Sequence, residues 1–170
     1  LERCREHVQQ GLTFAEALEL VAGGTVFTTH TPVPAGHDVF DAGLFQAYFG
    51  SFAGALGIGS AELMALGSLP GAEGSFNMTT LAVRGSRFQN GVSRIHGHVA
   101  SMMEQGLWPQ IPPEENPMTY VTNGVHVPTF LANEWFNLFE MRFDDWHSDL
   151  LIPQYWERIE QIPDFQFWSL

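Results

Sequence analysis

The sequence predicts an α/β fold that is mainly helical and holds a few short strands. Apolar residues recur at three- and four-residue steps in several segments, as on the buried face of a helix. Two short runs rich in β-branched and aromatic residues, 25–29 and 118–125, are bounded by glycine or proline, as strands are. With 170 residues, of which 45% are hydrophobic, the chain is long enough to bury a sizeable core.

Composition restricts the classes of partner. Seven arginines and no lysine stand against 19 acidic residues, and the formal net charge of -12 disfavours binding to nucleic acid or to an anionic membrane surface. No apolar run is long enough to span a bilayer, and the first ten residues lack the apolar stretch of a signal peptide. The single cysteine, Cys4, suits a reducing compartment, so we expect a cytoplasmic location. The missing initial methionine and the apolar end "FQFWSL" are typical of a piece of a larger protein.

Glycines and a capping box delimit the first two helices. Residues 1–10 predict the last turns of a helix that ends at Gly11, because glycine readily takes left-handed backbone angles. Thr13 begins the next helix, since Glu16 stands three residues on and completes a capping box. Gly23 and Gly24 then end that helix.

The run "TVFTT", residues 25–29, predicts a short buried strand. It leads into "TTHTPVPAGHD", residues 28–38, where two prolines and a glycine exclude a helix or a central strand. Ligands of open α/β sheets bind beyond the carboxyl ends of the strands. The polar side chains of this loop are therefore candidates for ligand contact.

Two further helices are predicted before residue 70. One covers residues 41–56, and Ser60 caps a short second one that runs through Leu66. The side chains of the first that we expect to face inward are Leu44, Phe45, Tyr48, Phe49 and Phe52.

The longest periodic segment begins at Asn77, a residue type favoured at the N-cap, and predicts one helix central to the core. Its apolar face comprises Met78, Leu81, Ala82, Gly85, Phe88, Val92, Ile95, Val99 and Met102. Each internal glycine costs a helix up to about 1 kcal/mol relative to alanine. Either another element approaches the backbone closely at these glycines, or the helix is interrupted near Asn90–Gly91.

The last third of the sequence begins with a loop. Residues 106–117 contain four prolines, and the β-formers that begin at Met118 then alternate as in a strand until the turn at Asn123–Gly124. Later helices are predicted to begin at Thr129 or Asn133, at Ile152–Pro153 and at Ile162–Pro163.

The histidines raise the alternative of a metal site. His96 and His98 form the tightest pair, but residues two apart on a helix point to different faces, so both reach one ion only if the helix breaks. We favour a hydrogen-bonded core role for His96 and a surface position for His98. His30 and His37 flank the proline loop and could form a site across it. Asp38 is the one acidic neighbour, so this pattern is only a weak indication of a metal site.

Three polar spots lie in apolar surroundings: "TTHTP" (28–32), "QNGVSRIHG" (89–97) and "VTNGV" (121–125). Each places an amide or imidazole beside a tight or broken backbone, which suits recognition of sugar hydroxyls by short, fixed donors and acceptors. The alternative is that Asn90 and Asn123 serve only the turn, because asparagine tolerates left-handed geometry before glycine. The pattern alone favours neither. The chain has no nucleophile elbow, P-loop or dinucleotide fingerprint.

Longer segments around these spots carry a resemblance. "FTTHTPVPAGHD", "FNMTTLAVRGSRFQNGVSRIHG" and "VTNGVHVPTFLANEW" closely resemble the α-glucan phosphorylases, the family of glycogen, starch and maltodextrin phosphorylase, in particular its shorter bacterial and archaeal type. The similarity runs in order along essentially the whole chain. It implies that the chain is an internal fragment of such an enzyme.

The resemblance implies a reaction and a fold. Family members cleave the terminal α-1,4 bond of a glucan with inorganic phosphate and release glucose 1-phosphate with retention of configuration. They have two Rossmann-like domains in the GT-B arrangement and bind pyridoxal phosphate through a lysine. Residues 1–122 would be the C-terminal part of the first domain and 123–170 the helical start of the second. The implied partners are an α-1,4-glucan or maltodextrin, inorganic phosphate and the remainder of the phosphorylase chain, and a homo-oligomer is left open.

The resemblance also assigns residues. His30 is similar to the histidine that contacts the glucosyl unit near its 6-hydroxyl, Asn123 to the asparagine that hydrogen-bonds that hydroxyl, and Val92 to the valine that lines the sugar pocket. Asn90 and His96 share the middle motif and are expected to support the pocket. No residue of this chain is predicted to be catalytic, to bind the cofactor or to bind a metal.

The sequence departs from the family pattern at several points. His98 stands where relatives usually have glutamate and His37 where many have asparagine, so neither is predicted to be catalytic. The anchoring lysine for pyridoxal phosphate is not in this chain, which has no lysine at all. We therefore expect residues 1–170 to be inactive alone.

Three functional hypotheses follow. The first is a glucose-recognising part of an α-glucan phosphorylase, active only with the rest of the chain. The second is a non-catalytic carbohydrate-binding or interaction module built on the same scaffold. The third is a histidine metalloprotein. A downstream lysine in the cofactor motif would support the first, and metal analysis decides the third.

Overall fold

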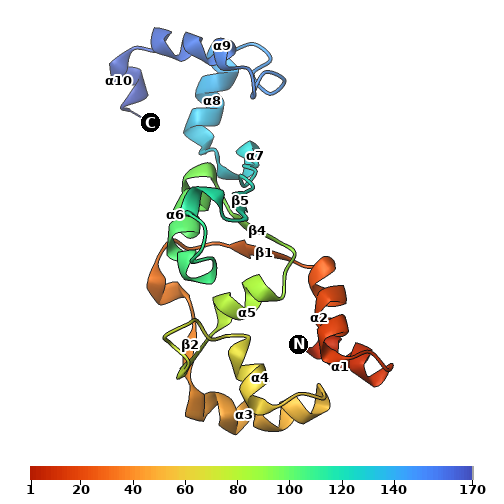
Figure 1. Cartoon of the computed structure of the whole chain (residues 1–170). Coiled ribbons are helices and arrows are strands. Elements are labelled where there is room, and N and C mark those ends of the chain that lie inside the picture. The colour runs from red at the N-terminus through yellow and green to blue at the C-terminus, as the bar shows by residue number, and fades with distance from the viewer. Residues whose placement is uncertain (170) are drawn as a thin grey trace. The chain divides into compact units, whose positions relative to one another are not determined.

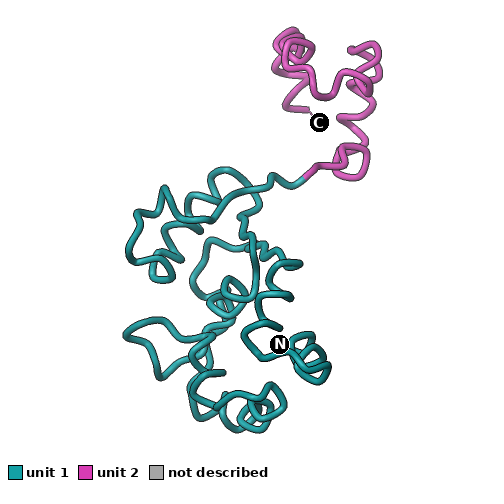
Figure 2. Tube along the Cα trace, turned by 45° about the vertical axis from the view of Figure 1, so that its right-hand side comes forward, with its two compact units in different colours: residues 1–123 teal, residues 124–170 magenta. Residues whose placement is uncertain are grey.

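The chain divides into two compact units in the computed structural model, which describes residues 1–169. Figure 2 distinguishes them as Leu1–Asn123 and Gly124–Leu170. The mixture of many helices with few short strands confirms the predicted α/β class.

Unit 1 contains every described strand. Its elements, with η for a short 3-10 helix, are α1 (Glu2–Gln9), α2 (Phe14–Gly23), β1 (Val26–Thr29), η1 (Pro34–Gly36), β2 (Val39–Asp41), α3 (Ala42–Ala55), α4 (Ser60–Ala65), β3 (Ser75–Asn77), α5 (Met78–Arg84), β4 (Phe88–Gly91), α6 (Arg94–Met103), η2 (Gln105–Leu107), η3 (Pro113–Glu115) and β5 (Met118–Tyr120) (Figure 1). Unit 2 contains α7 (Val127–Phe130), α8 (Asn133–Arg142), α9 (Pro153–Trp156), η4 (Glu157–Gln161) and α10 (Asp164–Phe167).

The predicted signals around the first two helices are confirmed. Gly11 has a φ of +104°, in the left-handed region that glycine favours. The backbone N–H of Glu16 donates to Thr13 Oγ1 at 3.3 Å, and Glu16 Oε2 accepts from the backbone N–H of Thr13 at 2.8 Å. This reciprocal capping box fixes the start of α2.

Two small sheets organise unit 1. Strands β1, β4 and β5 form a parallel sheet in the order β1-β4-β5, and β2 pairs with β3 in antiparallel fashion. Between β1 and β4 the chain makes a long excursion through α3, α4 and α5, whereas α6 alone connects β4 to β5 apart from two short 3-10 turns (Figure 1). The strand predicted at 25–29 is therefore an edge of this sheet rather than a fully buried strand, and Val26 is 59% exposed.

The prediction of one helix from Asn77 to Met102 is wrong. Asn77 does cap a helix, because its Oδ1 accepts from the backbone N–H groups of Thr79 and Thr80 at 2.8 and 3.2 Å. That helix ends at Arg84, and the segment "FQNG" forms β4 before α6 begins. The parallel pairing with β1 and β5 outweighs the helical spacing of the apolar residues, and two members of the predicted inward face, Phe88 and Ile95, are 65% and 78% exposed.

Two of the internal glycines allow α6 to lie against the sheet. A Cβ on Gly91 would stand 2.7 Å from the backbone nitrogen of Gly97, and a Cβ on Gly97 would stand 2.8 Å from the carbonyl oxygen of Thr119. Real Cβ atoms do not approach that closely. Both of the alternatives raised by the glycines therefore apply: the helix is interrupted, and the backbones of β4, α6 and β5 approach closely.

Helix α3 turns less of its apolar surface inward than predicted. Phe45 is buried and Phe52 packs against the core, but Leu44, Tyr48 and Phe49 are 44%, 75% and 45% exposed.

The predicted N-cap of α4, Ser60, is wrong. Gly59 occupies the N-cap of α4 without a side-chain bond, and Ser60 instead donates from Oγ to Gln46 Oε1 at 2.6 Å.

Each unit has its own apolar cluster. The cluster of unit 1 joins α1, α2, α3, α4 and β3 through Cys4, Phe14, Ala17, Phe45, Ala53, Leu56, Leu63 and Phe76. The cluster of unit 2 is largely aromatic and comprises Leu138, Phe139, Phe143, Trp146 and Ile162.

The helix starts predicted at Asn133 and Pro153 are confirmed. Thr129 instead lies inside α7, and α10 begins at Asp164 with Pro163 as its N-cap. Among residues 1–169, no helix combines the length and apolarity needed to cross a membrane.

Candidate functional site

The carboxyl ends of the three parallel strands form one edge of the sheet in unit 1. The register pairs Thr29 with Gly91 and Gly91 with Tyr120, so β1, β4 and β5 end side by side (Figure 1). The three predicted sugar-contact motifs, 28–32, 89–97 and 121–125, include the last residues of β1 and β4 or follow directly after β5. We call this the carboxyl edge. It is the place where ligands bind in open α/β sheets.

Backbone hydrogen bonds join two of the motifs at the carboxyl edge. The N–H of Val121 donates to the carbonyl of Gly91 at 2.9 Å, and the N–H of Asn123 donates to the carbonyl of Val92 at 3.3 Å. Val92 and Asn123 are thus held next to each other although they belong to different strand ends. Asn123 is exposed and Val92 is half-buried, so the Asn123 amide is accessible.

His30 lies directly after β1. The preceding residue, Thr29, is buried, whereas the His30 side chain is exposed. The loop that follows is bent near its start, where the Val33 N–H donates to Thr31 Oγ1 at 3.2 Å. The structure therefore places His30 at the same edge as Val92 and Asn123, with its imidazole accessible.

Asn90 has its polar atoms engaged inside the sheet. The Oγ1 of Thr28 donates to Asn90 Oδ1 at 3.0 Å across the β1–β4 pair, and Asn90 Nδ2 donates to the carbonyl of Gly91 at 3.2 Å. The residue is buried. This arrangement suits the predicted supporting role, because the amide fixes the last residues of two strands to each other.

His96 supports the backbone of the middle motif. It lies in the first turn of α6, which Ser93 caps by accepting from the His96 N–H at 3.1 Å. The N–H of Val92 donates to His96 Nδ1 at 3.3 Å, so the ring proton of neutral His96 lies on Nε2. That Nε2 is buried and has no hydrogen-bond partner among the described residues. His96 is the hydrogen-bonded core residue that we expected, and His98 is exposed.

His37 makes a contact that the sequence did not reveal. Its Nδ1 is 2.7 Å from Thr79 Oγ1 and 3.6 Å from Glu104 Oε1, and the side chains of His37 and Glu104 are each 10% exposed. Burial raises the pKa of the Glu104 carboxyl, and the His37 imidazole acts in the opposite direction. No sequence signal pairs residues so far apart.

Within residues 1–169, no three histidine, cysteine or acidic side chains gather as metal ligands would.

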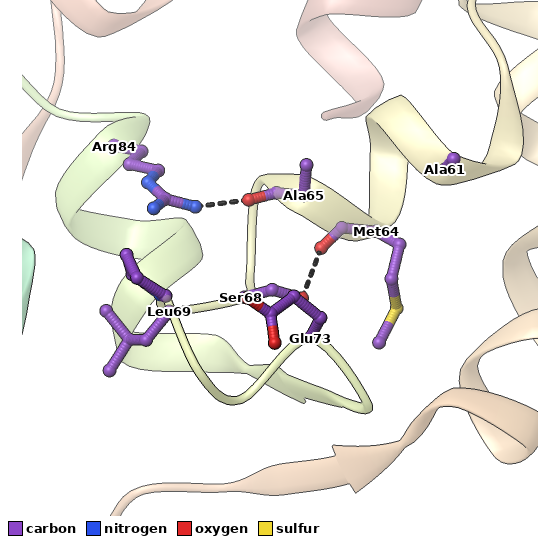
Figure 3. Close-up of a pocket in the computed structure, with 8 residues that line it drawn as sticks. Ala61, Met64, Ala65, Ser68, Leu69, Glu73 and Arg84 are labelled. Atoms are coloured by element: carbon purple, nitrogen blue, oxygen red, sulfur yellow. Dashed lines mark hydrogen bonds between the residues drawn. The ribbon is translucent and has the colours of Figure 1, made fainter.

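A separate pocket lies between α4, the following turn and α5, and contains none of the predicted sugar-contact residues. Its volume is about 420 Å³, and it is lined by small and apolar side chains together with Ser68, Glu73 and Arg84. Figure 3 shows the Arg84 guanidinium directed at the carbonyl of Ala65, to which it donates a hydrogen bond. Ser68 donates from Oγ to the carbonyl of Met64 at 3.0 Å, so both polar groups hold the pocket wall together.

Comparison with known proteins relates the whole chain to one enzyme family. The chain is 38% identical over 170 residues to the maltodextrin phosphorylase of Thermococcus litoralis, covering 99% of this chain and 20% of that protein. It is 39% identical over 176 residues to the glycogen phosphorylase of Mycobacterium tuberculosis, with the same coverage, and 33% identical to that of Aquifex aeolicus, covering 95% of this chain and 23% of that protein. No protein-family model matches the chain. The predicted resemblance to the α-glucan phosphorylases is confirmed, and the chain spans about a fifth of the length of the curated relatives it matches.

Proposed function

We propose that residues 1–170 are part of an α-1,4-glucan phosphorylase that releases glucose 1-phosphate from the end of a glucan by transfer to inorganic phosphate. The observation that carries the proposal is the meeting of three separate motifs at one sheet edge. Those motifs lie in a chain that is similar throughout to glycogen and maltodextrin phosphorylases. As part of the same proposal, residues 1–122 complete the first Rossmann-like domain of a GT-B enzyme, and 123–170 begin the second.

In this proposal the carboxyl edge binds the glucosyl unit. His30 and Asn123 are exposed, and each offers a hydrogen-bonding group to the 6-hydroxyl of the sugar. Val92 supplies apolar contact beside them. Asn90 and His96 do not touch the sugar but fix the strand ends and the Val92 backbone, so that the contacts are held in position before the ligand arrives.

The residues of this chain do not fit pyridoxal phosphate as its lysine-linked cofactor, because the chain has no lysine. The cofactor, and the basic residues that a phosphate substrate requires, would come from the rest of the protein. We therefore expect residues 1–170 alone to show neither phosphorolysis nor the absorbance of a lysine-linked pyridoxal phosphate.

The test uses His30→Ala and Asn123→Ala in the complete enzyme that carries this chain. Each should lower kcat/KM by a factor that corresponds to about 1–3 kcal/mol of lost transition-state stabilisation, because the sugar hydroxyl loses its hydrogen-bond partner in the protein. His98→Ala is the matched control, since His98 is exposed on α6 and predicted to be uninvolved, and its kcat/KM should stay unchanged. Unchanged kcat/KM in both site variants would remove these residues from the site. A complete protein that binds maltodextrin but lacks all phosphorolysis would instead favour the carbohydrate-binding module.

A further inference from the structure

A second pocket lies at the amino-terminal edge of the same sheet, opposite the carboxyl edge. Its volume is about 250 Å³, and its lining includes Ser86 and Arg87, which precede β4, and Pro117, which precedes β5. We call it the amino-edge pocket. Arg87 and Val92 are separated along β4 by five residues, or roughly 16 Å at about 3.3 Å per residue. The pocket is therefore distinct from the proposed sugar contacts.

Two arginines line the amino-edge pocket without a carboxylate partner. Arg84 and Arg87 both contribute to its wall. Within residues 1–169 neither takes part in an ion pair, although the chain holds 19 acidic residues and only seven basic ones. Glu73 lines the neighbouring pocket together with Arg84, but its carboxylate accepts a hydrogen bond from the Gly71 N–H at 2.9 Å and forms no ion pair with Arg84. Arg84 Nη1 already donates to the carbonyl of Ala65 at the neighbouring pocket, so the donors for an oxyanion here are the remaining N–H groups of Arg84 and the guanidinium of Arg87.

The segment that carries these arginines is fixed by buried hydrogen bonds. Gln89 is 4% exposed, and its Nε2 donates to the carbonyls of Val83 and Ser86 at 3.2 and 2.7 Å. The backbone N–H of Arg87 donates to the carbonyls of Ala22 and Thr25 at 3.0 and 3.1 Å. The turn from α5 to β4 is therefore held at both ends, and the positions from which the two side chains project are defined before any ligand binds.

The rest of the lining suits an organic group. Leu107, Trp108 and Pro117 supply an apolar wall that includes one indole ring, and the Ser86 hydroxyl adds a short donor. An inorganic anion would use the arginines and the hydroxyl but leave this wall without a partner. A small molecule that joins an oxyanion to an apolar or ring-shaped group would use both.

We propose that the amino-edge pocket binds a small phosphate ester, whose phosphate accepts hydrogen bonds from Arg84, Arg87 and Ser86 while its organic group packs on Trp108. Phosphate is the better match than carboxylate because its three terminal oxygens can accept from both guanidinium groups and the hydroxyl together. The site does not depend on the function proposed for the carboxyl edge.

The experiment is fluorine NMR of the complete polypeptide that carries residues 1–170, labelled with 5-fluorotryptophan. The Trp108 resonance is assigned by its loss in Trp108→Phe. Phenyl phosphate, glycerol 2-phosphate and inorganic phosphate are titrated separately at constant ionic strength, with chloride as the reference anion. We expect the Trp108 resonance to shift with saturation, at the lowest concentration for phenyl phosphate and the highest for inorganic phosphate.

Variants test whether binding depends on the two pocket arginines or only on the overall charge of the protein. Arg84→Gln and Arg87→Gln should each weaken phenyl phosphate binding at least about tenfold, equivalent to about 1.4 kcal/mol. Arg3→Gln, which removes an exposed arginine on α1, should leave binding unchanged. Asn123→Ala should also leave it unchanged, so a failure of the proposed sugar site would not be mistaken for a failure of this one.

Four outcomes would overturn the proposal, three on anion binding and one on the ester group. The Trp108 resonance could stay in place with all three phosphates, it could move equally with chloride, or it could respond unchanged in both arginine variants. If inorganic phosphate bound as tightly as phenyl phosphate, the ester assignment would be overturned because the apolar wall would contribute nothing. The other tryptophan resonances report whether a variant is folded, and Arg87→Lys provides a second, milder change at the same position.

Discussion

The imidazole of His37 lies 3.6 Å from the carboxylate of Glu104 in the interior of unit 1, where both side chains are 10% exposed. His37 follows the proline loop that starts at His30, whereas Glu104 is the C-cap of α6. Thr79, on α5, completes the contact at 2.7 Å from His37 Nδ1. The far end of the loop that carries His30 is therefore fastened to two helices by a buried polar contact.

The Glu104 carboxyl should make the stability of the protein depend on pH. Burial raises its pKa in the folded state above the ordinary value of 4.5, so the contribution of this group is largest below pH 4.5 and is lost as the pH rises through the raised pKa. Glu104→Gln cannot ionise and should remove this loss. Urea unfolding from pH 4 to pH 8 should show the variant gaining stability relative to the wild type as the pH rises. The exposed Glu115→Gln is the control, and a parallel pH profile for Glu104→Gln and the wild type would contradict the assignment.

Alanine at Gly91 or Gly97 should destabilise unit 1. The new Cβ would meet the backbone of Gly97 in the first case and the carbonyl of Thr119 in the second, each closer than 3.0 Å. Backbone atoms cannot yield as a flexible side chain can, so we expect a loss of roughly 2–3 kcal/mol in the free energy of unfolding. Gly54→Ala is the matched control, because Gly54 lies in α3 with nothing within 4 Å of a Cβ, and it should gain up to about 1 kcal/mol. Equal effects at Gly54 and Gly91 would show that the close approach is not tight.

The hydrogen bond between Thr28 and Asn90 should couple β1 to β4. The two side chains meet at 3.0 Å although 62 positions separate them in the sequence. A double-mutant cycle with Thr28→Val and Asn90→Ala should give a coupling energy of about 0.5–1.5 kcal/mol in urea unfolding. The pair Thr13→Val and Asn90→Ala should be additive, because the Thr13 side chain bonds to Glu16 and not to Asn90. Additivity of the Thr28 and Asn90 changes would mean that the bond does not contribute.

The capping box of α2 should be worth about 1 kcal/mol of stability. Thr13→Ala removes the oxygen that accepts from the Glu16 N–H and should lower the free energy of unfolding by that amount, measured by urea titration. Thr13→Ser keeps the hydroxyl and should retain most of the stability. If the alanine and serine variants were equally stable, the cap would have no energetic role.

Most local signals were predictable from the sequence, the cap at Ser60 being an exception, and pairings between distant segments were not. Gly11, Thr13 and Asn77 act through neighbours within a few residues, so their effects on the backbone follow from residue type and spacing. Strand β4 was missed because "FQNG" contains two polar residues, Gln89 and Asn90, that are buried here. Gln89 Nε2 donates to turn carbonyls and Asn90 Oδ1 accepts from Thr28, and only the assembled sheet provides the second of these hydrogen bonds.

The candidate site shows the same division. The motif resemblance selected His30, Val92 and Asn123, and the parallel order β1-β4-β5 then brings the segments that hold them to one edge. Spacing alone left the role of Asn90 open, because an asparagine before glycine has the same appearance whether it serves a turn or a sheet. The amino-edge pocket was not predicted, since its lining joins Arg84, Arg87 and Trp108 from segments that lie more than 20 residues apart in the sequence.

The order of the strands has a consequence for folding. Every pairing of β1 with β4 closes a loop that includes α3, α4 and α5, and the Thr28–Asn90 bond closes one of 62 residues. Contacts of such long range form slowly, because the entropy of closing the loop is lost before the strand pairing compensates for it. We therefore expect the carboxyl edge to form late in folding, so that a partly folded chain that already has α1, α2 and α3 would still lack it. A ligand that contacts the ends of both β1 and β4 binds only the completed sheet. By mass action, its binding would therefore shift the folding equilibrium toward the chain in which this sheet has formed.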